Sequence, residues 1–226
     1  MLCVLEFGQN GSDMRVATYN VHSCRGADGV SDPERIAAVL EELQADLVGL
    51  QEIESHRRRV PDMNQFAYFA GLAGWHFTPG LAIEEGRGRY GNGLLSRERP
   101  TAAVVHDISA VGLEPRSVLE VAVAGLTVLV SHLSLSPPAR ARQIRFLAGL
   151  AGDRRAVVLA DFNEWNPLSR SFRPLAGLKQ PATGPTYPAR FPLLRLDRIY
   201  GVRRAWVHGS PLARRASDHL PVLGEL

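Results

Sequence analysis

The feature that most constrains this sequence is a series of short apolar runs, each of which leads directly into a polar side chain. Residues 156–160 are the most apolar run, and Asp161 follows them at once. Arg15–Asn20 and residues 47–51 are runs of the same kind, and the second leads into Glu52. Apolar runs of about four to eight residues are typical of buried strands. The sequence therefore predicts buried strands that carry polar groups at their ends.

Other segments predict helices and further strands. Residues 31–34 (Ser-Asp-Pro-Glu) combine a capping box with an early proline, so a helix is expected to begin there. Apolar residues then recur at helical spacing and predict one buried helix face: Ile36, Val39, Leu40 and Leu43. Two more helices are expected over residues 65–72 and 138–150. Their inward residues would be Phe66, Phe69, Ala70, Ile144 and Leu147.

Residues 117–123 and 126–131 predict a hairpin around the Ala124-Gly125 turn, and its second strand leads into His132. Residues 195–200 and 220–223 predict the last two strands. Residues 167–192 are rich in proline and lack periodicity, which favours a long surface loop. We expect one domain over residues 14–226, with residues 1–13 as a disordered or non-native extension.

The composition is that of an ordinary globular protein. The 226 residues are 45% hydrophobic and 22% charged, and no apolar run reaches the roughly 18–20 residues of a membrane span. No signal peptide is recognisable, and only Cys3 and Cys24 are present. We therefore expect a cytoplasmic monomer without a disulfide framework. The net charge of +3 comes almost wholly from arginine, since Lys179 is the only lysine. This charge does not decide the substrate.

The polar residues at the strand ends form a coherent set. Asn20, Glu52, His132 and Asp161 each come at the end of an apolar strand, and Asp218-His219 precede the last one. Strand ends in a packed sheet lie along shared edges, where polar groups can converge on one cleft. The sequence therefore predicts one site built from residues that are far apart along the chain.

The residue types indicate metal-assisted acid–base chemistry. Glu52 and a second carboxylate such as that of Asp218 are the hard oxygen ligands that Mg²⁺ or Mn²⁺ prefers. Histidines are suited to acid–base work or to contacts with phosphate oxygens; the two candidates here are His132 and His219. Asp161 and Asn163 are two positions apart and, in extended backbone, point the same way. They could pair a proton acceptor for water with an amide that holds an oxyanion.

Each residue by itself also fits an ordinary structural role. An aspartate at a strand end is commonly a turn or helix cap, and Asn20 could be a plain turn residue. The remaining histidines are interpreted as structural or simply exposed: His22, His56, His76, His106 and His208. Capping does not require this set of residue types at so many strand ends, and that joint pattern favours a functional site.

A series of motifs resembles the endonuclease/exonuclease/phosphatase (DNase I-like) superfamily, in its small bacterial form. In the family's order they are TYNVH at 18–22, LQEI at 50–53, YGNGLLS at 90–96, SHL at 131–133, LADFN at 159–163, LDRI at 196–199 and SDHLP at 217–221. The resemblance covers the chain from about residue 14 to its end. It implies a four-layer α/β/β/α sandwich in which two mixed β-sheets pack face to face between helices.

The resemblance also implies a role for each motif residue. Glu52 would be the principal Mg²⁺ (or Mn²⁺) ligand, supported by Asn20 and Asp218. Asp161 would orient or deprotonate the attacking water, and Asn163 would hold a phosphoryl oxygen. His219, paired with Asp197, would stabilise the transferring group. His132 would contact phosphate or protonate the leaving oxygen.

Two further residues are candidates for phosphate binding. Arg116 resembles a phosphate-contacting arginine of some relatives, and a simple exposed charge at a strand start is an equal alternative. Asn92, in the YGNG motif, is expected to support the edge of the site. Abasic-site endonucleases carry an acidic residue where this chain has His22, so the sequence argues against abasic repair.

The sequence thus predicts a divalent-metal-dependent phosphoester hydrolase that uses in-line attack by water. We expect its substrate to be a small or lipid-derived phosphoester. A DNA or RNA nuclease is the alternative enzyme, because of the arginine content. A catalytically silent protein that binds a phosphorylated ligand is the alternative from another class. Trp165, Phe172, Tyr187 and Phe191 leave a role at a membrane surface open.

Overall fold

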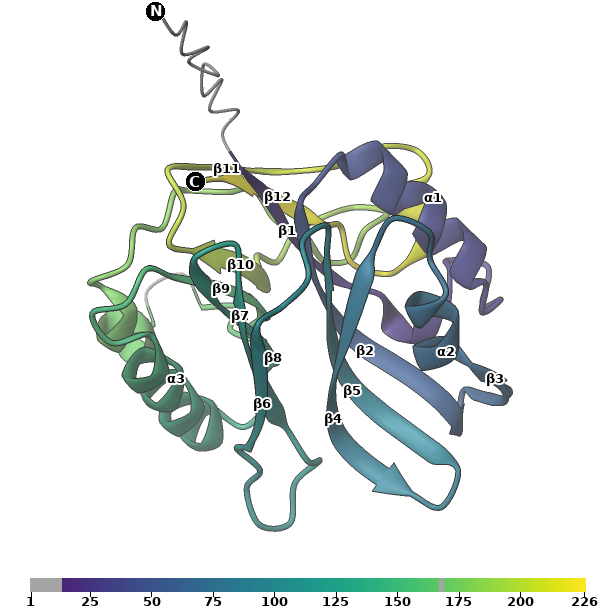
Figure 1. Ribbon diagram of the computed structural model, residues 1–226, viewed down its shortest axis with the longest axis horizontal. Helices are drawn as coiled ribbons and strands as arrows, with labels where there is room; N and C mark the ends of the chain where they lie inside the picture. Colours follow the sequence, from purple (N-terminus) through teal and green to yellow (C-terminus); the bar gives the residue numbers. More distant parts are fainter. Residues whose placement is uncertain (1–13, 167–168) are drawn as a thin grey trace, which may run out of the picture.

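Two β-sheets packed face to face form the centre of the molecule, and helices cover both outer faces (Figure 1). The computed structural model describes residues 14–166 and 169–226; the expected extension at residues 1–13 lies outside this part. The seven-stranded sheet has the order β11-β12-β1-β2-β5-β4, with β3 paired to β2. Its strands are β1 (Arg15–Asn20), β2 (Leu47–Arg57), β3 (Val60–Asn64), β4 (His76–Glu85), β5 (Gly88–Ser96), β11 (Arg204–Val207) and β12 (Val222–Glu225).

The second sheet has five strands in the order β10-β9-β8-β7-β6. They are β6 (Ala102–Asp107), β7 (Ser117–Val123), β8 (Leu126–His132), β9 (Ala156–Asp161) and β10 (Asp197–Tyr200). Each sheet is mixed, because β1 pairs with β2 and β8 pairs with β9 in parallel while the other pairings are antiparallel. The predicted four-layer sandwich is therefore confirmed.

The facing sheets approach closely because two glycines leave room for leucines. A Cβ on Gly49 of β2 would lie 2.8 Å from the Cβ of Leu159, and a Cβ on Gly80 of β4 would lie 2.6 Å from that of Leu119. The inner layer is otherwise aliphatic, with alternate residues of each strand turned inward. This alternation decides which residues at the strand ends point between the sheets.

Helices cover the outer faces through their apolar sides. On the seven-stranded sheet lie α1 (Pro33–Leu43), α2 (Gln65–Ala70) and the short α4 (Ala213–Ala216). The outer face of the five-stranded sheet is covered by α3 (Pro137–Ala151) and η2 (Arg170–Leu175). A three-residue turn, η1 (His22–Cys24), follows β1. No helix in the described part of the chain is long and apolar enough to cross a membrane.

Most expected elements are present, with several corrections. The side chain of Asp32, rather than Ser31, caps α1 by accepting from the Glu34 amide. Ala70 was expected to be buried but is exposed at the end of α2, which stops two residues earlier than expected. The 167–192 loop contains η2, because Phe172 packs on Phe162 and Tyr200. Residues 167 and 168 lie outside the described residues.

Candidate active site

Several predicted residues point between the sheets because they continue the inward alternation of their strands. His132 follows the inward residues of β8, and Asp161 follows Val157 and Leu159 of β9. Asn20 follows Val16 and Thr18 on β1 in the same way. Parallel pairing of β8 with β9 sets His132 beside Asp161. The sheet register therefore brings these side chains to one edge of the sandwich, as the sequence predicted.

Glu52 reaches the same edge by a different route. It was expected at the end of a strand, but β2 continues to Arg57 and Glu52 lies within it. Leu50 pairs with Gly93 and Ile53 with Gly91, so β2 carries one extra residue here. Glu52 has a φ of +58°, which is a costly conformation for a residue with a side chain. This β-bulge frees Glu52 from the alternation and turns it toward the other sheet.

The Asn20 amide links the two sheets. Its Nδ2 donates to Glu52 Oε1 at 3.0 Å and to Asp161 Oδ2 at 2.9 Å. The Ser217 hydroxyl donates to the Asn20 backbone oxygen at 2.8 Å and holds the 217–219 segment against β1. Burial raises the pKa of Glu52, but the lowering effect of His132, the Asn20 amide and nearby cations is larger and brings this pKa to about 2. Glu52 is therefore ionised at neutral pH.

His219 and Asp197 form a hydrogen-bonded pair. His219 Nδ1 donates to Asp197 Oδ2 at 2.8 Å, and the Thr186 hydroxyl donates to the same oxygen at 2.5 Å. The other ring nitrogen, Nε2, lies 3.8 Å from Asp161 Oδ2. Burial lowers the pKa of His219, but the charge and hydrogen bond of Asp197 outweigh it and raise the pKa to about 10. His219 is thus a cation directed at Asp161.

His132 has the opposite charge state. Burial and the Arg116 guanidinium lower the pKa of His132 to about 3, so its ring is neutral at neutral pH. Asn163 Nδ2 donates to His132 Nε2 at 2.8 Å and to the Leu133 carbonyl at 2.8 Å. Arg116 Nη1 lies 3.4 Å from His132 Nδ1. One histidine of the site is therefore charged and the other is neutral, because their neighbours differ.

Asp161 lies between these groups and is fully buried. Burial and the charge of Asp197 raise the pKa of Asp161 to about 6, against the lowering effects of His219 and the Asn20 amide. The Asn163 backbone amide donates to Asp161 Oδ1 at 2.8 Å. A carboxylate with a pKa near neutrality is suited to accept a proton from water.

An open cleft of about 560 Å³ leads to these side chains. We call them the polar cluster: Asn20, Glu52, His132, Asp161, Asn163, Asp197 and His219. It is lined by Glu52, Glu54, Arg57, Arg58, Arg59, Ile83, Glu85, Tyr90, Glu114, Pro115, Arg116, His132, Leu135 and Asn163. The predicted residues Glu52, Arg116, His132 and Asn163 line the cleft, whereas Asp161, Asp197 and His219 lie behind them. Asn92 does not line it: its amide donates to the Ser117 carbonyl at 3.1 Å, beneath the bulge.

Asp218 and Glu52 offer oxygens that suit a divalent cation. The Asp218 Oδ1 atom is buried without a hydrogen-bond partner and lies 3.4 Å from His22 Nδ1. Burial raises the pKa of Asp218; His219 and His22 lower it, and the negative charge of Glu52 raises it again. A cation between the two carboxylates would relieve this repulsion. The donor chemistry therefore fits Mg²⁺ or Mn²⁺.

A second group of possible ligands fits a metal less well. Atoms of Asp161, Asp197 and His219 all lie within 4.8 Å of one another. The hydrogen bonds that His219 and Thr186 donate to Asp197 account for this proximity, and they already occupy Oδ2 of that carboxylate. We therefore interpret these three residues as a hydrogen-bonded network.

Sequence reasoning missed four neighbours of the site. Arg59 Nη1 pairs with Glu52 Oε2 at 3.0 Å, and His22 lies beside Asp218. The Tyr187 ring contacts the His219 ring with 4.9 Å between centroids, and the Tyr90 hydroxyl lies 3.4 Å from Arg116 Nη1. The sequence signal was weak: His22 and Tyr90 lie inside the TYNVH and YGNGLLS motifs, and Arg59 follows Glu52 by seven residues.

Several known proteins are similar to this chain in sequence or in fold. The chain is 32% identical to the uncharacterized protein YbhP of Escherichia coli K12, over 94% of this chain and 95% of that protein. It is similar to the crystal structure of an endonuclease/exonuclease/phosphatase from Beutenbergia cavernae, with a TM-score of 0.78, 27% identity, and coverage of 94% of this chain and 71% of that one.

Zebrafish (D. rerio) TDP2, solved as a complex with a single-strand DNA product, has a TM-score of 0.68 to this chain. It is 16% identical over 95% of this chain and 98% of its own, so it shows a shared fold alone. The sequence model of the Endonuclease/Exonuclease/phosphatase family matches residues 17–219. The matched segment contains all of the polar cluster, and the chain therefore belongs to this family, whose members are hydrolases that act on phosphoester bonds.

Proposed function

We propose that this protein is a divalent-metal-dependent phosphoester hydrolase that activates water for in-line attack. The observation that carries the proposal is the polar cluster itself. Asn20 Nδ2 bridges Glu52 and Asp161, while a cationic His219 and a neutral His132 lie on either side of Asp161. This combination supplies a proton acceptor, an anion-stabilising cation and metal-binding oxygens in one place.

We assign the metal site to Glu52, Asn20 and Asp218. Glu52 is ionised, Asp218 has an unpartnered buried oxygen, and Asn20 adds a neutral oxygen. Asn20 Oδ1 already accepts from the His22 backbone amide at 3.0 Å, so its part is the smallest of the three. When bound, Mg²⁺ or Mn²⁺ would polarise the phosphoryl oxygens and offset their negative charge.

The protein's own groups supply the remaining chemistry. Asp161 accepts a proton from the attacking water, whose oxygen forms the new bond to phosphorus as the bond to the leaving oxygen breaks. The leaving oxygen takes the bonding electron pair and a proton from solvent. His219 and Arg116 stabilise the negative charge that develops on the phosphoryl oxygens. Asn163 Nδ2 donates to one of these oxygens by giving up its hydrogen bond to His132 Nε2. His132 is neutral, which favours a role in contacting phosphate over a role as the acid.

The proposal is tested with bis(4-nitrophenyl) phosphate as substrate. We expect hydrolysis with Mg²⁺ or Mn²⁺ and none after EDTA treatment. Asp161→Asn should lower kcat roughly a thousandfold, because it removes the proton acceptor. His219→Ala should lower it roughly a hundredfold or more, because it removes the buried cation.

His208→Ala is the matched control, since the His208 side chain pairs at 2.7 Å with Glu42 of α1, on the outer face of the seven-stranded sheet. This variant should keep wild-type activity. Absence of turnover with either metal, or unchanged turnover in both active-site variants, would rule the proposal out.

A nuclease is the second candidate, supported by the four arginines that line the cleft: Arg57, Arg58, Arg59 and Arg116. A nuclease should nick plasmid DNA or degrade single strands, and its binding should weaken steeply with salt as counterions are released. Salt-independent behaviour without cleavage would remove this candidate.

A further inference from the structure

Exposed apolar side chains are concentrated around the mouth of the cleft. Six of the ten large hydrophobic side chains that are exposed in the described part of the chain lie in four loops. We call these loops the rim: residues 108–116, 133–136, 162–166 and 187–194. The six side chains are those of Val111, Leu113, Leu135, Trp165, Phe191 and Leu193. Among the described residues, the other four exposed side chains of this kind are Val30, Val104, Val105 and Phe146.

Each rim loop is anchored by a residue of the site. The 108–116 loop ends at Arg116, and the 133–136 loop directly follows His132. The 162–166 loop contains Asn163, and the 187–194 loop begins with Tyr187, whose ring contacts His219. Three of the four rim loops therefore supply residues to the cleft lining, and the fourth contacts the polar cluster through Tyr187.

The rim side chains project into solvent rather than into a core. Val111 is 105% exposed and Leu193 is 78% exposed. The loop that carries Val111 protrudes beyond the ends of β6 and β7 (Figure 1). Apolar side chains in this position gain nothing from folding, and such patches commonly mark surfaces that bind a partner or a membrane.

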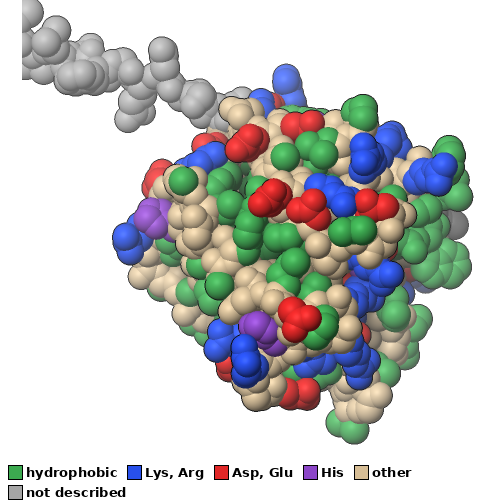
Figure 2. All heavy atoms as spheres, turned by 90° about the vertical axis from the view of Figure 1, so that its right-hand side faces the viewer, with side chains coloured by type: hydrophobic (Ala, Val, Ile, Leu, Met, Phe, Trp, Pro, Cys, Tyr) green, Lys and Arg blue, Asp and Glu red, His purple; other side chains and the backbone are tan. Residues whose placement is uncertain are grey.

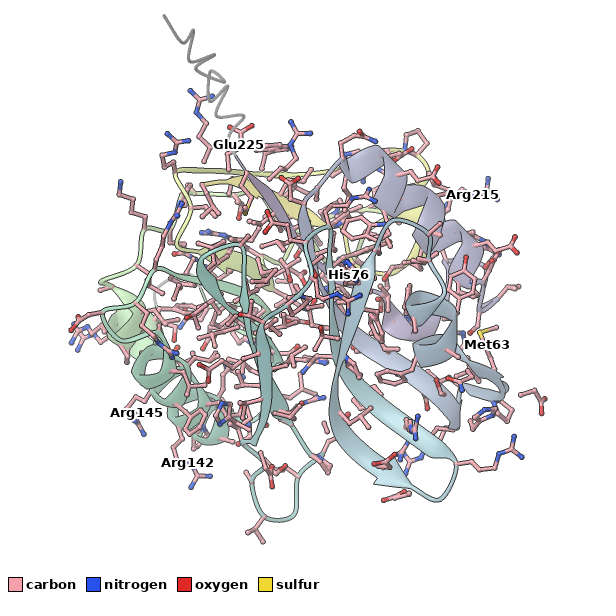
Figure 3. The ribbon with its side chains drawn as sticks, viewed as in Figure 1. Met63, His76, Arg142, Arg145, Arg215 and Glu225 are labelled. Carbon is pink, nitrogen blue, oxygen red and sulfur yellow. The ribbon has the colours of Figure 1, made fainter. Side chains whose placement is uncertain are left out.

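Arginines border the rim, whose own four charged residues, Glu114, Arg116, Glu164 and Arg190, sum to no net charge. Arg142 of α3 lines a hollow together with Val111, and Figure 3 shows Arg142 and Arg145 pointing away from the helix into solvent. Arg190 lies over the Phe191 ring at 5.7 Å. The two acidic residues of the rim, Glu114 and Glu164, are paired with Arg116 and Arg140. In contrast, acidic and basic side chains are interspersed on the face that carries α1 and α2 (Figure 2).

We propose that the rim is a docking surface for an anionic phospholipid bilayer. Exposed aliphatic and aromatic side chains can insert between head groups while arginines pair with lipid phosphates. Four of the six apolar side chains are aliphatic, and aliphatic groups do not provide the stacking platforms that single-stranded nucleic acid requires. Bordering arginines would attract either partner, so it is the side-chain type that favours a lipid surface over nucleic acid.

This docking would bring head-group phosphoesters to the cleft. The substrate class that follows is a phosphoester of a membrane lipid, and this second step rests on the proposed function. The docking surface itself does not depend on catalysis. It can therefore be tested by binding alone.

The test is co-sedimentation of the full chain with vesicles of equal parts phosphatidylcholine and phosphatidylglycerol. We expect the wild-type chain to sediment with these vesicles and less with pure phosphatidylcholine. The double variant Val111→Asp/Leu193→Asp should lower the bound fraction about tenfold, because it places two charges where apolar groups insert. Both sites are exposed, so the variant should fold, which circular dichroism would verify.

Val30→Asp is the matched control, because Val30 is 53% exposed and lies outside the rim. It should bind vesicles like the wild-type chain, and hydrolysis of bis(4-nitrophenyl) phosphate should be unchanged in the double variant. Absence of wild-type sedimentation, or equal sedimentation of the double variant, would overturn the docking surface. Binding to single-stranded DNA in place of vesicles would also overturn it. Vesicle binding without any hydrolysis would leave the surface standing and remove the proposed function.

Discussion

The polar cluster and the rim meet at the same cleft but are built in opposite ways. Five side chains of the cluster are buried, and the other two, those of Glu52 and Asn163, are partly buried; each takes part in hydrogen bonds with a neighbouring strand or loop, as Asn20 does with Glu52 and Asp161. The rim is exposed and its apolar tips, such as Val111, have little contact with the rest of the molecule. The difference suggests two separate roles, in which the cluster determines the chemical reaction and the rim determines which substrates reach the cluster.

The comparison predicts that changes in the cluster alter the chemical step. Asp197→Asn should lower kcat about ten- to a hundredfold, because Asp197 orients and charges His219. The pH profile should change as well. Asp197 holds the pKa of His219 at about 10, so the ring is charged below that pH. Without Asp197, burial lowers this pKa, and the cation should be lost as pH rises through the lower value.

The kcat/KM profile of the Asp197→Asn variant should therefore fall earlier on the alkaline side than that of the wild type. Glu42→Gln is the matched control, because it removes a carboxylate that pairs with His208 at 2.7 Å on α1, outside the seven-stranded sheet. Its profile should superimpose on that of the wild type. Parallel profiles for Asp197→Asn and wild type would contradict the assigned role of His219.

The sheet packing beneath the cluster gives a second prediction. Gly49→Ala should lower the free energy of unfolding by about 1–3 kcal/mol, because the new methyl group would lie 2.8 Å from the Leu159 Cβ. Activity should fall too, since β2 and β9 carry Glu52 and Asp161. Urea denaturation and steady-state kinetics would measure both effects.

Gly149→Ala provides the control for that substitution. No atom lies within 4 Å of a Cβ placed on Gly149, which is in α3. Alanine there should raise the free energy of unfolding by up to about 1 kcal/mol, because glycine is a poor helix former. Equal destabilisation by the two substitutions would show that the close approach of the sheets at Gly49 is not what limits stability.

Residues at the ends of apolar strands could be predicted from the sequence, whereas residues placed by strand pairing or by loops could not. His132 and Asp161 lie at the ends of strands with a clear apolar pattern, so their convergence followed from strand alternation. The bulge at Glu52 was not predictable, because its cause is the pairing of β2 with β5, and β5 was recognised only as a motif. The strands β3, β4, β6 and β11 were also missed. β6 begins with a four-residue apolar run (AAVV) although it is exposed, and this run was not interpreted as a strand; the four-residue β11 (RAWV) is too short to carry such a run.

The neighbours of the site were harder still to predict. Thr186 and Tyr187 contact the Asp197–His219 pair from a proline-rich loop whose path depends on tertiary contacts. Arg59 belongs to a run of three arginines, and nothing in the sequence around Arg57, Arg58 and Arg59 indicates that all three line the cleft. Sequence patterns locate strand ends, but they do not give the direction in which a turn presents its side chains.

Substitution of Arg58 is expected to have the smallest effect of these changes, and it tests whether residues around the cluster act on substrate binding alone. It lies in the two-residue turn between β2 and β3, is exposed and lines the cleft. Within the described residues it has no ion pair, whereas the other arginines of the cleft, Arg57, Arg59 and Arg116, each have one. Arg58→Ala should raise KM about threefold for a substrate with a second anionic group and leave kcat unchanged, because Arg58 can attract that group without touching the reacting atoms.

The KM for bis(4-nitrophenyl) phosphate, which carries one negative charge, should rise less. Arg87→Ala is the control, since Arg87 is an exposed arginine in the β4–β5 turn that does not line the cleft. If Arg58→Ala lowered kcat as strongly as the cluster variants do, the separation between a catalytic cluster and a surface that selects substrate would fail. If KM were unchanged for both substrates, Arg58 would not contribute to the attraction of anionic substrates. That attraction would then come from the arginines that are paired with glutamates, above all from Arg116 next to His132.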